Sequence, residues 1–311
     1  MGDDIQMIIE KIYFSAMDDI QLFGLLHKCD ENFEKNVEKS VVLSVHGMTS
    51  NCSKNRENIF AQEFTEKGID FFCFDNRGAD IIKYFEKVRD GKLITRIESG
   101  SAFEKFEDSY NDIKGALKML VEKGYKNIYI QGHSLGSAKT VYTYNKLKQN
   151  FEIDLLEKIK GICLLSIVDI PRMARALLGR KFDEVLKEIK GMVNEGRGEE
   201  IIPREYFLHP ISATNFLYFT QLEGTIDFVP FGAENPTFPA LDNIDCPLLM
   251  TWGTERDLIL QKPEKLESII KNNTKKTNIT IKFIEETGHN YRGKEKQLAK
   301  TILGTLLERG E

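Results

Sequence analysis

Long apolar runs are missing from this 311-residue sequence. None approaches the ~18 consecutive apolar residues that a membrane-spanning helix needs. The N-terminal stretch MGDDIQMIIEK is acidic, and no apolar segment of the kind found in a secretory signal peptide follows it. We therefore expect neither a membrane span nor a secretory signal.

Cysteine is also scarce. The five cysteines are an odd number, and no two of them form a CxxC pair. Three of them lie within apolar, strand-like runs, which is typical of reduced and buried thiols. This pattern predicts a cytoplasmic protein without disulfides. The five are Cys29, Cys52, Cys73, Cys163 and Cys246.

Neither sign of charge dominates, since 43 Lys and Arg residues stand against 48 Asp and Glu residues, a net charge of −5. A mildly acidic chain with both signs interspersed is a poor candidate for binding nucleic acid or an anionic membrane. The sequence contains no HExxH, no Cys/His cluster, no EF-hand loop, no P-loop and no GxGxxG. We therefore expect no metal and no cofactor, and the sequence does not indicate an oligomeric state.

An alternation of short β-branched runs with helical patterns organises most of the chain. Such alternation predicts an α/β fold with a mainly parallel sheet that helices cover on both faces. The predicted strands span residues 8–14, 20–26, 41–45, 71–74, 127–131, 161–168, 247–252 and 279–284. The predicted helices span 55–67, 106–121, 137–147 and 182–192. One more begins at Pro263, and a final helix contains Leu298, Ile302, Leu303, Leu306 and Leu307.

The alternation breaks between about residues 171 and 240. Helical charge patterns, loops with Gly and Pro, and many aromatics replace it there. A segment of this length is too long for a plain loop, so a helical insertion is predicted. Its aromatics could line a substrate pocket or form the insertion's own core: Tyr206, Phe207, Phe216, Tyr218, Phe219, Phe228 and Phe231.

The strongest chemical signal is Gly132-His133-Ser134-Leu135-Gly136, a GxSxG match. It follows a predicted strand and precedes a predicted helix, which is the setting of a nucleophile elbow. There the serine sits in a sharp turn, and the flanking glycines let strand and helix pass closely. The alternative is an ordinary turn in which the serine caps the helix. We predict that Ser134 is a nucleophile.

A nucleophilic serine needs a base, and the chain offers five histidines. Loops at the carboxyl ends of parallel strands share one edge of the sheet. His289 and His46 follow strands in this way, while His27 lies in a strand, His133 within the elbow and His209 in the insertion. His289 is the predicted base. Its alternative role is that of a loop histidine capping the final helix.

The base needs an orienting carboxylate, and three candidates are open. Asp257 and Glu255 lie in the loop after the strand predicted over 247–252, and Asp169 follows the strand predicted over 161–168. The chain order Ser134, Asp257, His289 favours Asp257.

The oxyanion of an acyl-transfer intermediate needs two backbone N–H donors. Leu135, directly after the nucleophile, is one predicted donor. The other should come from the loop after the strand over 41–45, where Gly47 lets the next amide swing inward. Met48 is therefore the second predicted donor. The alternative for this loop is a plain strand-to-helix turn.

These motifs, in this order, resemble the α/β-hydrolase superfamily over nearly the whole chain. The turn at 75–80, Asp-Asn-Arg-Gly-Ala-Asp, is similar to the family's Asp-x-Arg-Gly-His-Gly turn, with Ala79 where a histidine is usual. The 46–49 loop and the 100–108 stretch resemble small esterases related to feruloyl and siderophore esterases. Asp257 lies four residues after Gly253, where three is commoner in the family.

The resemblance implies an α/β-hydrolase fold with a mainly parallel eight-stranded sheet, helices on both faces and a helical lid. The core domain would comprise residues 1–169 and 241–311, with residues 170–240 as a lid over the active site. The expected activity is hydrolysis of a small-molecule carboxylic ester through an acyl-enzyme. A thioesterase, an acyltransferase with the same triad, and a catalytically silent scaffold used for binding are the alternatives.

Overall fold

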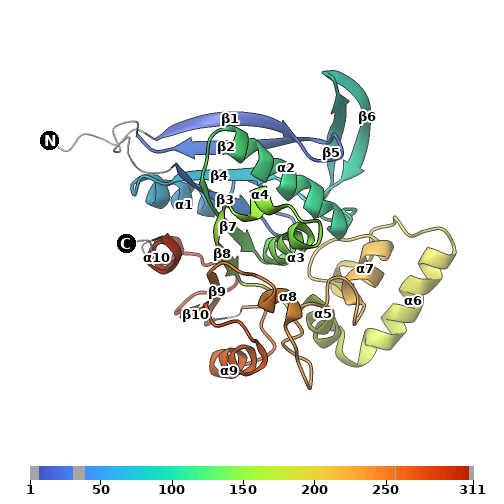
Figure 1. The fold of residues 1–311 in the computed structure, drawn as a ribbon. Helices are drawn as coiled ribbons and strands as arrows, with labels where there is room; N and C mark the ends of the chain where they lie inside the picture. The colour runs from blue at the N-terminus through green and yellow to red at the C-terminus, as the bar shows by residue number, and fades with distance from the viewer. Residues whose placement is uncertain (1–6, 31–38, 256, 308–311) are drawn as a thin grey trace.

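The computed structural model of the protein describes residues 7–30, 39–255 and 257–307 (Figure 1). At its centre is one eight-stranded sheet with the strand order β1-β2-β4-β3-β7-β8-β9-β10. Strand β2 runs antiparallel to both of its neighbours, and the strands from β4 to β10 are parallel. This confirms the mainly parallel, eight-stranded sheet. Its strands are β1 Ile8–Ser15, β2 Gln21–Lys28, β3 Ser40–Val45, β4 Asp70–Asp75, β7 Asn127–His133, β8 Ile159–Leu165, β9 Leu248–Gly253 and β10 Ile279–Ile284.

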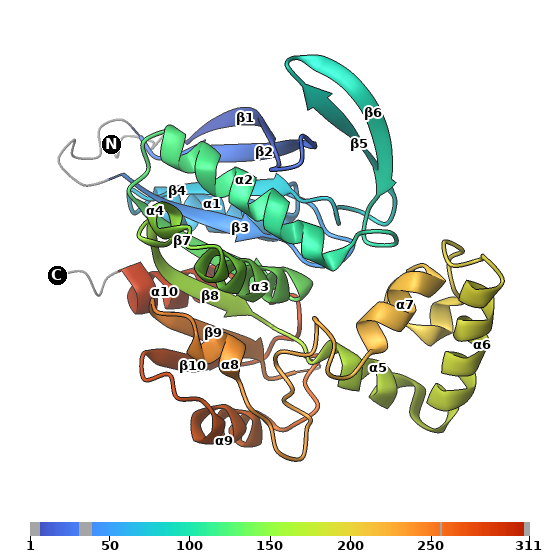
Figure 2. The ribbon, with the colours of Figure 1, turned by 45° about the vertical axis from the view of Figure 1, so that its right-hand side comes forward.

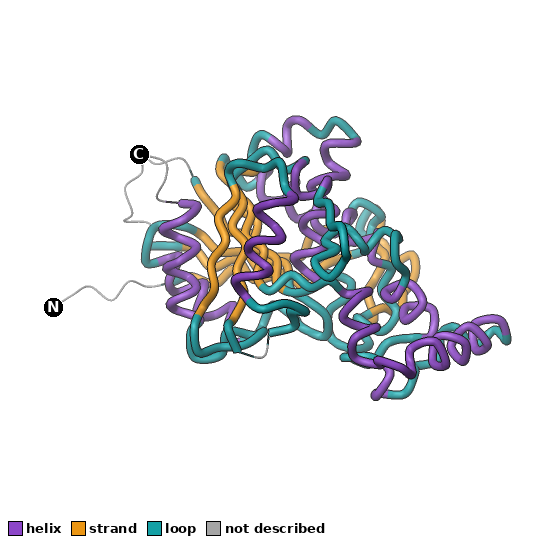
Figure 3. Tube along the Cα trace, turned by 90° about the horizontal axis from the view of Figure 1, so that it is seen from below, coloured by secondary structure: helices purple, strands orange, loops and turns teal. Residues whose placement is uncertain are grey.

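Helices pack on both faces of this sheet (Figure 3), which explains why its central strands are largely apolar and buried along most of their length. All six residues of β4 and of β9 are buried. Helices α2, α3 and α9 contribute buried apolar side chains to one core cluster, and α1 and α10 to another on the opposite face. The helices around the sheet are α1 Asn55–Thr65, α2 Ser109–Glu122, α3 Leu135–Gln149, α4 Ile153–Leu156, α8 Pro239–Asp242, α9 Pro263–Asn273 and α10 Glu295–Ile302, with short turns η1 Phe106–Asp108 and η4 Leu303–Leu307.

The register of the parallel strands brings their carboxyl ends to one edge. Val45 pairs with Gly132, His133 with Leu165, Leu165 with Thr251, and Gly253 with Ile284. The loops that leave these strands therefore start side by side. Strand β8 ends at Leu165, three residues before the predicted end, because Ser166 adopts a left-handed conformation with φ +47°.

The segment between β8 and α8 leaves the sheet at this edge and forms a helical unit beside it (Figure 2). Helix α6 buries Phe182, Val185, Ile189 and Met192, spaced three and four residues apart as in the predicted amphipathic helix. These side chains form a third core cluster that also contains Leu135 and Ala138 of α3. The elements of the segment are α5 Ile170–Leu178, η2 Gly179–Lys181, α6 Phe182–Asn194, η3 Arg204–Tyr206 and α7 Ala213–Thr220.

The aromatics of this segment divide between two cores. Phe216 and Phe219 are fully buried within the segment's own cluster. Phe231 packs instead against Trp252 of β9, with ring centroids 5.9 Å apart, and belongs to the main core together with Val229 and Phe238. The end of the segment is thus packed on the sheet.

A two-stranded hairpin was not predicted from the sequence. Strands β5 Lys83–Arg89 and β6 Lys92–Ser99 pair antiparallel and project away from the sheet (Figure 1). Asp90 and Gly91 form its turn with φ of +51° and +71°, as the Asp-Gly dipeptide favours. That dipeptide was the signal in the sequence for this hairpin.

All five cysteines are free thiols. Among the described helices, none combines the length and the apolar character needed to cross a bilayer.

Candidate active site

Ser134 stands in a strained turn between β7 and α3. Its φ of +54° and ψ of −122° are unusual for a residue with a side chain. Glycines permit the close packing around it: a Cβ at Gly132 would lie 2.4 Å from the carbonyl oxygen of Gly136, and one at Gly136 would lie 2.1 Å from that of Val45. The turn has the geometry of the predicted elbow.

The loop after β3 approaches this turn equally closely. A Cβ at Gly47 would lie 2.7 Å from the carbonyl oxygen of His133 and 2.9 Å from the Cβ of Ser134. Met48 and Leu135 both line the pocket that reaches Ser134. Within the described residues, neither the N–H of Met48 nor that of Leu135 has a hydrogen-bond acceptor. Two free amides are therefore present beside the serine.

His289 and Asp257 are in direct contact. The Nδ1 of His289 lies 2.7 Å from Oδ1 of Asp257. The side chain of Asp257 is fully buried, and its Oδ2 accepts hydrogen bonds from Ser166 Oγ at 2.7 Å and from the N–H of Gly253 at 2.8 Å. Burial alone would raise the pKa of Asp257, but the hydrogen bond and charge of His289, with Ser166 and Gly253, lower it overall. Asp257 is thus a carboxylate that fixes Nδ1 of His289.

The other two acid candidates do not contact His289. Glu255 is exposed shortly after the end of β9, and its backbone N–H donates to the carbonyl oxygen of Thr287 at 2.8 Å. Asp169 caps helix α5: its carboxylate accepts from the N–H of Arg172 at 3.3 Å and from the N–H of Gly232 at 2.9 Å. It also forms an ion pair with the Arg172 side chain at 3.3 Å. Burial raises the pKa of Asp169, although these partners oppose the change.

Two further histidines support the loops of the site. His133 donates from Nε2 to the carbonyl oxygen of His289 at 2.7 Å, so it holds the loop that carries the base. His46 accepts the N–H of Asn76 at Nε2, 3.2 Å away, so Nδ1 carries its proton and donates to the carbonyl oxygen of Gly47 at 2.9 Å. Burial, helped by nearby Lys139, lowers the pKa of His46 to about 4, which keeps the ring neutral.

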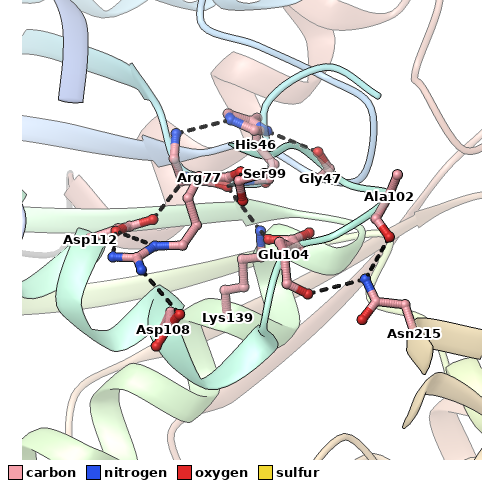
Figure 4. Close-up of polar contacts among 12 residues, drawn as sticks. His46, Gly47, Arg77, Ser99, Ala102, Glu104, Asp108, Asp112, Lys139 and Asn215 are labelled. Carbon is pink, nitrogen blue, oxygen red and sulfur yellow. Dashed lines mark hydrogen bonds and ion pairs between the residues drawn. The ribbon is translucent and has the colours of Figure 1, made fainter. Parts of the chain in front are cut away.

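A buried polar network lies behind the 46–49 loop (Figure 4). Lys139 of α3 forms an ion pair with Glu104 and donates to Oδ1 of Asn76 at 2.9 Å. Arg77 binds Asp112 and Asp18 through its guanidinium group. The turn at 75–80 is thus anchored from several sides, and Asn76 in turn contacts His46.

Two hollows meet at Ser134. One is a small apolar pocket of about 30 Å³, and the other is a larger polar groove of about 540 Å³. Ser134, Met48 and His209 line both, whereas His289 lines only the groove. The apolar pocket is completed by Leu135, Val168, Ile170, Met173, Ala174, Phe207, Leu208 and Leu258. Of the insertion's aromatics named from the sequence, Phe207 is the one that reaches this pocket.

His209 is the residue that sequence reasoning missed. It lies in the insertion, and only its position beside Pro210 distinguishes it in the sequence. Burial, and then the proximity of His289, lowers the pKa of His209. Across residues 7–30, 39–255 and 257–307, no group of three or more His, Cys, Asp or Glu side chains is placed to hold a metal ion.

Comparison with known proteins gives two matching family models. One, described as serine aminopeptidase, S33, matches residues 36–156. The other, described as protein of unknown function (DUF1749), matches residues 99–307. No curated protein sequence matches the chain.

Solved structures of similar fold include several esterases. Est1E from Butyrivibrio proteoclasticus, with ferulic acid bound, is 18% identical with a TM-score of 0.61, over 95% of this chain and 98% of its own. The esterase Pf2001 of Pyrococcus furiosus is 16% identical with a TM-score of 0.58, over 97% and 91%. A thermostable carboxyl esterase from Bacillus coagulans is 13% identical with a TM-score of 0.62, over 97% and 100%. The chain therefore has the α/β-hydrolase fold, and it belongs to the α/β-hydrolase superfamily and to the family of proteins of unknown function DUF1749.

Proposed function

We propose that this protein is a serine hydrolase that cleaves a carboxylic ester. One observation carries the proposal: His289, held by Asp257 through Nδ1, lines the same groove as Ser134, which stands on a strained elbow. A nucleophile, a base and an orienting carboxylate are the three groups that acyl transfer requires.

The reaction follows from these positions. Because Nδ1 of His289 is bound to Asp257, Nε2 is the nitrogen that takes the proton of Ser134. The serine oxygen attacks the ester carbonyl, and the N–H groups of Met48 and Leu135 bind the oxyanion. One such donor contributes about 10²–10³ in kcat in a serine protease. His289 then protonates the leaving alcohol, and water releases the acyl group from Ser134.

Asp257 is the acid of this proposal. It alone of the three candidates hydrogen-bonds to His289, whereas Asp169 is engaged by Arg172 and Gly232 and Glu255 is exposed. The four-residue separation from Gly253 is compatible with this role, because the carboxylate turns back to accept the N–H of Gly253.

Residues 170–240 serve in this proposal as a lid on a core domain of residues 1–169 and 241–311. Ile170, Met173, Ala174 and Phe207 line the apolar pocket at Ser134, and His209 lines both this pocket and the groove. A segment that forms one wall of a pocket controls which substrates enter it.

A fluorophosphonate probe tests the proposed nucleophile. It should label wild-type protein and leave Ser134→Ala unlabelled, while kcat for p-nitrophenyl acetate falls by several orders of magnitude in the variant. Ser268→Ala, in α9 and outside the lining of the groove, is the matched control. It should retain both labelling by the probe and the wild-type kcat. Wild-type ester hydrolysis in Ser134→Ala would refute the proposal. Faster turnover of acyl-CoA than of any oxyester would reassign the protein as a thioesterase.

A further inference from the structure

The two hollows at Ser134 have different chemistry, and the base distinguishes them. A histidine that protonates the leaving group must lie on the leaving-group side of the scissile bond. Since His289 lines the polar groove and not the apolar pocket, the groove receives the alcohol and the pocket receives the acyl group. This assignment rests on the proposed function.

Basic side chains dominate the groove, in a chain whose net charge is −5. Its charged lining consists of Lys54, Arg56 and Arg292 against Glu295, together with His209 and His289. Within the described part of the chain, the side chains of Lys54 and Arg292 have no ion-pair partner. The groove therefore offers unneutralised positive charge beside the serine.

The side chain of Arg56 is largely buried and is held in place at the groove by other side chains. Its side chain is only 10% exposed, and its Nε and Nη2 bind Oε1 of Glu57 at 3.2 and 2.8 Å. Glu57 is itself buried and accepts from Ser44 Oγ at 2.6 Å. The Nη1 group has no hydrogen-bond partner among the described residues. A guanidinium fixed in this way presents remaining N–H donors with little loss of side-chain entropy on binding.

We infer that the alcohol part of the substrate carries an anionic group, a carboxylate or a phosphate, which binds in this groove to Arg56 with Lys54 and Arg292 beside it. Planar N–H donors of arginine match both kinds of oxyanion. A neutral alcohol would leave Lys54 and Arg292 with only Glu295 as a nearby counter-charge in the groove, and it would offer no anionic acceptor to the unbonded Nη1 of Arg56. The apolar pocket, in contrast, takes a small uncharged acyl group.

Matched acetate esters test the inference. The three substrates are 4-acetoxybenzoate, its neutral methyl ester and 4-acetoxyphenyl phosphate, each corrected for its rate of hydroxide hydrolysis. We expect the wild-type kcat/KM to favour both anionic esters by about tenfold over the neutral one, and the preference to shrink at about 0.5 M NaCl because salt screens charge. The better of the two anionic esters identifies the group that binds.

Substitutions in the groove locate the effect. The double variant Lys54→Gln/Arg292→Gln and the single variant Arg56→Gln should each lower the anionic-to-neutral ratio by roughly fivefold, and Glu295→Gln should raise it. Arg96→Gln, on the exposed hairpin, is the control and should leave the ratio unchanged. If Arg56→Gln does not fold, the double variant still tests the inference, because Lys54 and Arg292 are exposed.

A binding measurement separates this inference from the proposed function. In Ser134→Ala protein, calorimetry should show that 4-hydroxybenzoate and 4-hydroxyphenyl phosphate bind more tightly than methyl 4-hydroxybenzoate. That preference should fall in the Lys54→Gln/Arg292→Gln background. Equal binding of the charged and neutral compounds overturns the inference even if Ser134 proves to be the nucleophile. Failure of Ser134 to react with a fluorophosphonate refutes the proposed function instead.

Discussion

Lys139 and Glu104 form an ion pair with a nitrogen–oxygen distance of 2.5 Å, and each side chain is only 1% exposed. Lys139 lies on the helix that follows Ser134, and Glu104 on the loop before η1. Asn215 of α7 donates to the carbonyl oxygens of Ala102 and Glu104 at 3.0 and 3.2 Å (Figure 4). The pair therefore joins the elbow helix to the loop on which the helical insertion rests.

Breaking this pair on one side should destabilise the protein strongly. Lys139→Met leaves the carboxylate of Glu104 buried without its cation, and such losses typically cost about 3–5 kcal/mol. Urea unfolding should show that loss. The double variant Lys139→Met/Glu104→Leu should lose less than Lys139→Met, since no unpaired charge remains. Arg96→Gln, which removes the exposed ion pair with Glu86, is the control. It should lower the free energy of unfolding by less than about 1 kcal/mol. A loss below about 1 kcal/mol in Lys139→Met would contradict the expectation.

His27 gives a second, pH-dependent prediction. Its ring is fully buried in β2 against Phe71, and within the described residues neither ring nitrogen has a hydrogen-bond partner. Burial lowers the pKa of His27. The unfolded chain therefore binds this proton at a higher pH than the folded chain does. The titration of His27 therefore leaves the free energy of unfolding unchanged above the unfolded pKa of about 6.5. As the pH falls below that value, protonation of the unfolded chain lowers the free energy of unfolding.

The substitution His27→Leu should remove that loss. It replaces two unsatisfied polar atoms by an apolar side chain, so the free energy of unfolding at pH 7 should stay equal to that of wild type or rise by about 1 kcal/mol. Between about pH 6.5 and 5 its slope should flatten by up to about 1.4 kcal/mol per pH unit. Urea unfolding across this pH range measures both. Because His46 and His133 stay in place, the difference in slope reports His27 alone. Parallel slopes would show that His27 gains a partner on protonation.

The sheet and the elbow were predictable because their signals are local. Buried parallel strands require continuous apolar runs, and close approach at the elbow requires glycine at 132 and 136. The 83–99 hairpin was missed because its strands are largely exposed and lack a clean apolar alternation. The burial of Lys139 and Glu104 depends on segments 35 residues apart, so no local pattern indicates it. The same holds for His209, which reaches the site only through the path of the insertion.

The acyl pocket should respond to Met173. This residue of α5 lines the small apolar pocket, and Met173→Ala would enlarge it. The ratio of kcat/KM for p-nitrophenyl hexanoate to that for the acetate should rise by about tenfold, since one or two methylene groups are worth about 1–3 kcal/mol in a fitted pocket. Leu177→Ala, at an exposed position of the same helix, is the control and should leave this ratio of kcat/KM values unchanged. An unchanged ratio would place the acyl group elsewhere.

Conservative amide substitutions at the three acidic candidates should separate their roles. Asp257→Asn changes little volume but removes the negative charge that favours the proton on Nδ1 of His289, 2.7 Å away. In a serine protease the equivalent loss lowers kcat by about 10⁴ through the wrong imidazole tautomer, and we expect a loss of that order here. The kcat of p-nitrophenyl acetate hydrolysis measures it, with circular dichroism to check folding.

Asp169→Asn and Glu255→Gln serve as matched comparisons in that experiment. An asparagine at 169 keeps only one acceptor oxygen, so it can cap α5 or accept the N–H of Gly232 but not both. Because Asp169 does not contact His289, the kcat of this variant should still fall by less than about tenfold. Glu255 is exposed and makes no hydrogen bond to His289, so its substitution should also lower kcat by less than about tenfold.

Asp257 also holds its own loop, because its Oδ2 accepts hydrogen bonds from Ser166 Oγ and from the N–H of Gly253. The side-chain oxygen of an asparagine can still accept both bonds in one orientation of the amide. Folding should therefore survive in Asp257→Asn while the tautomer is lost. A deep loss confined to Asp169→Asn would move the catalytic acid to the end of β8.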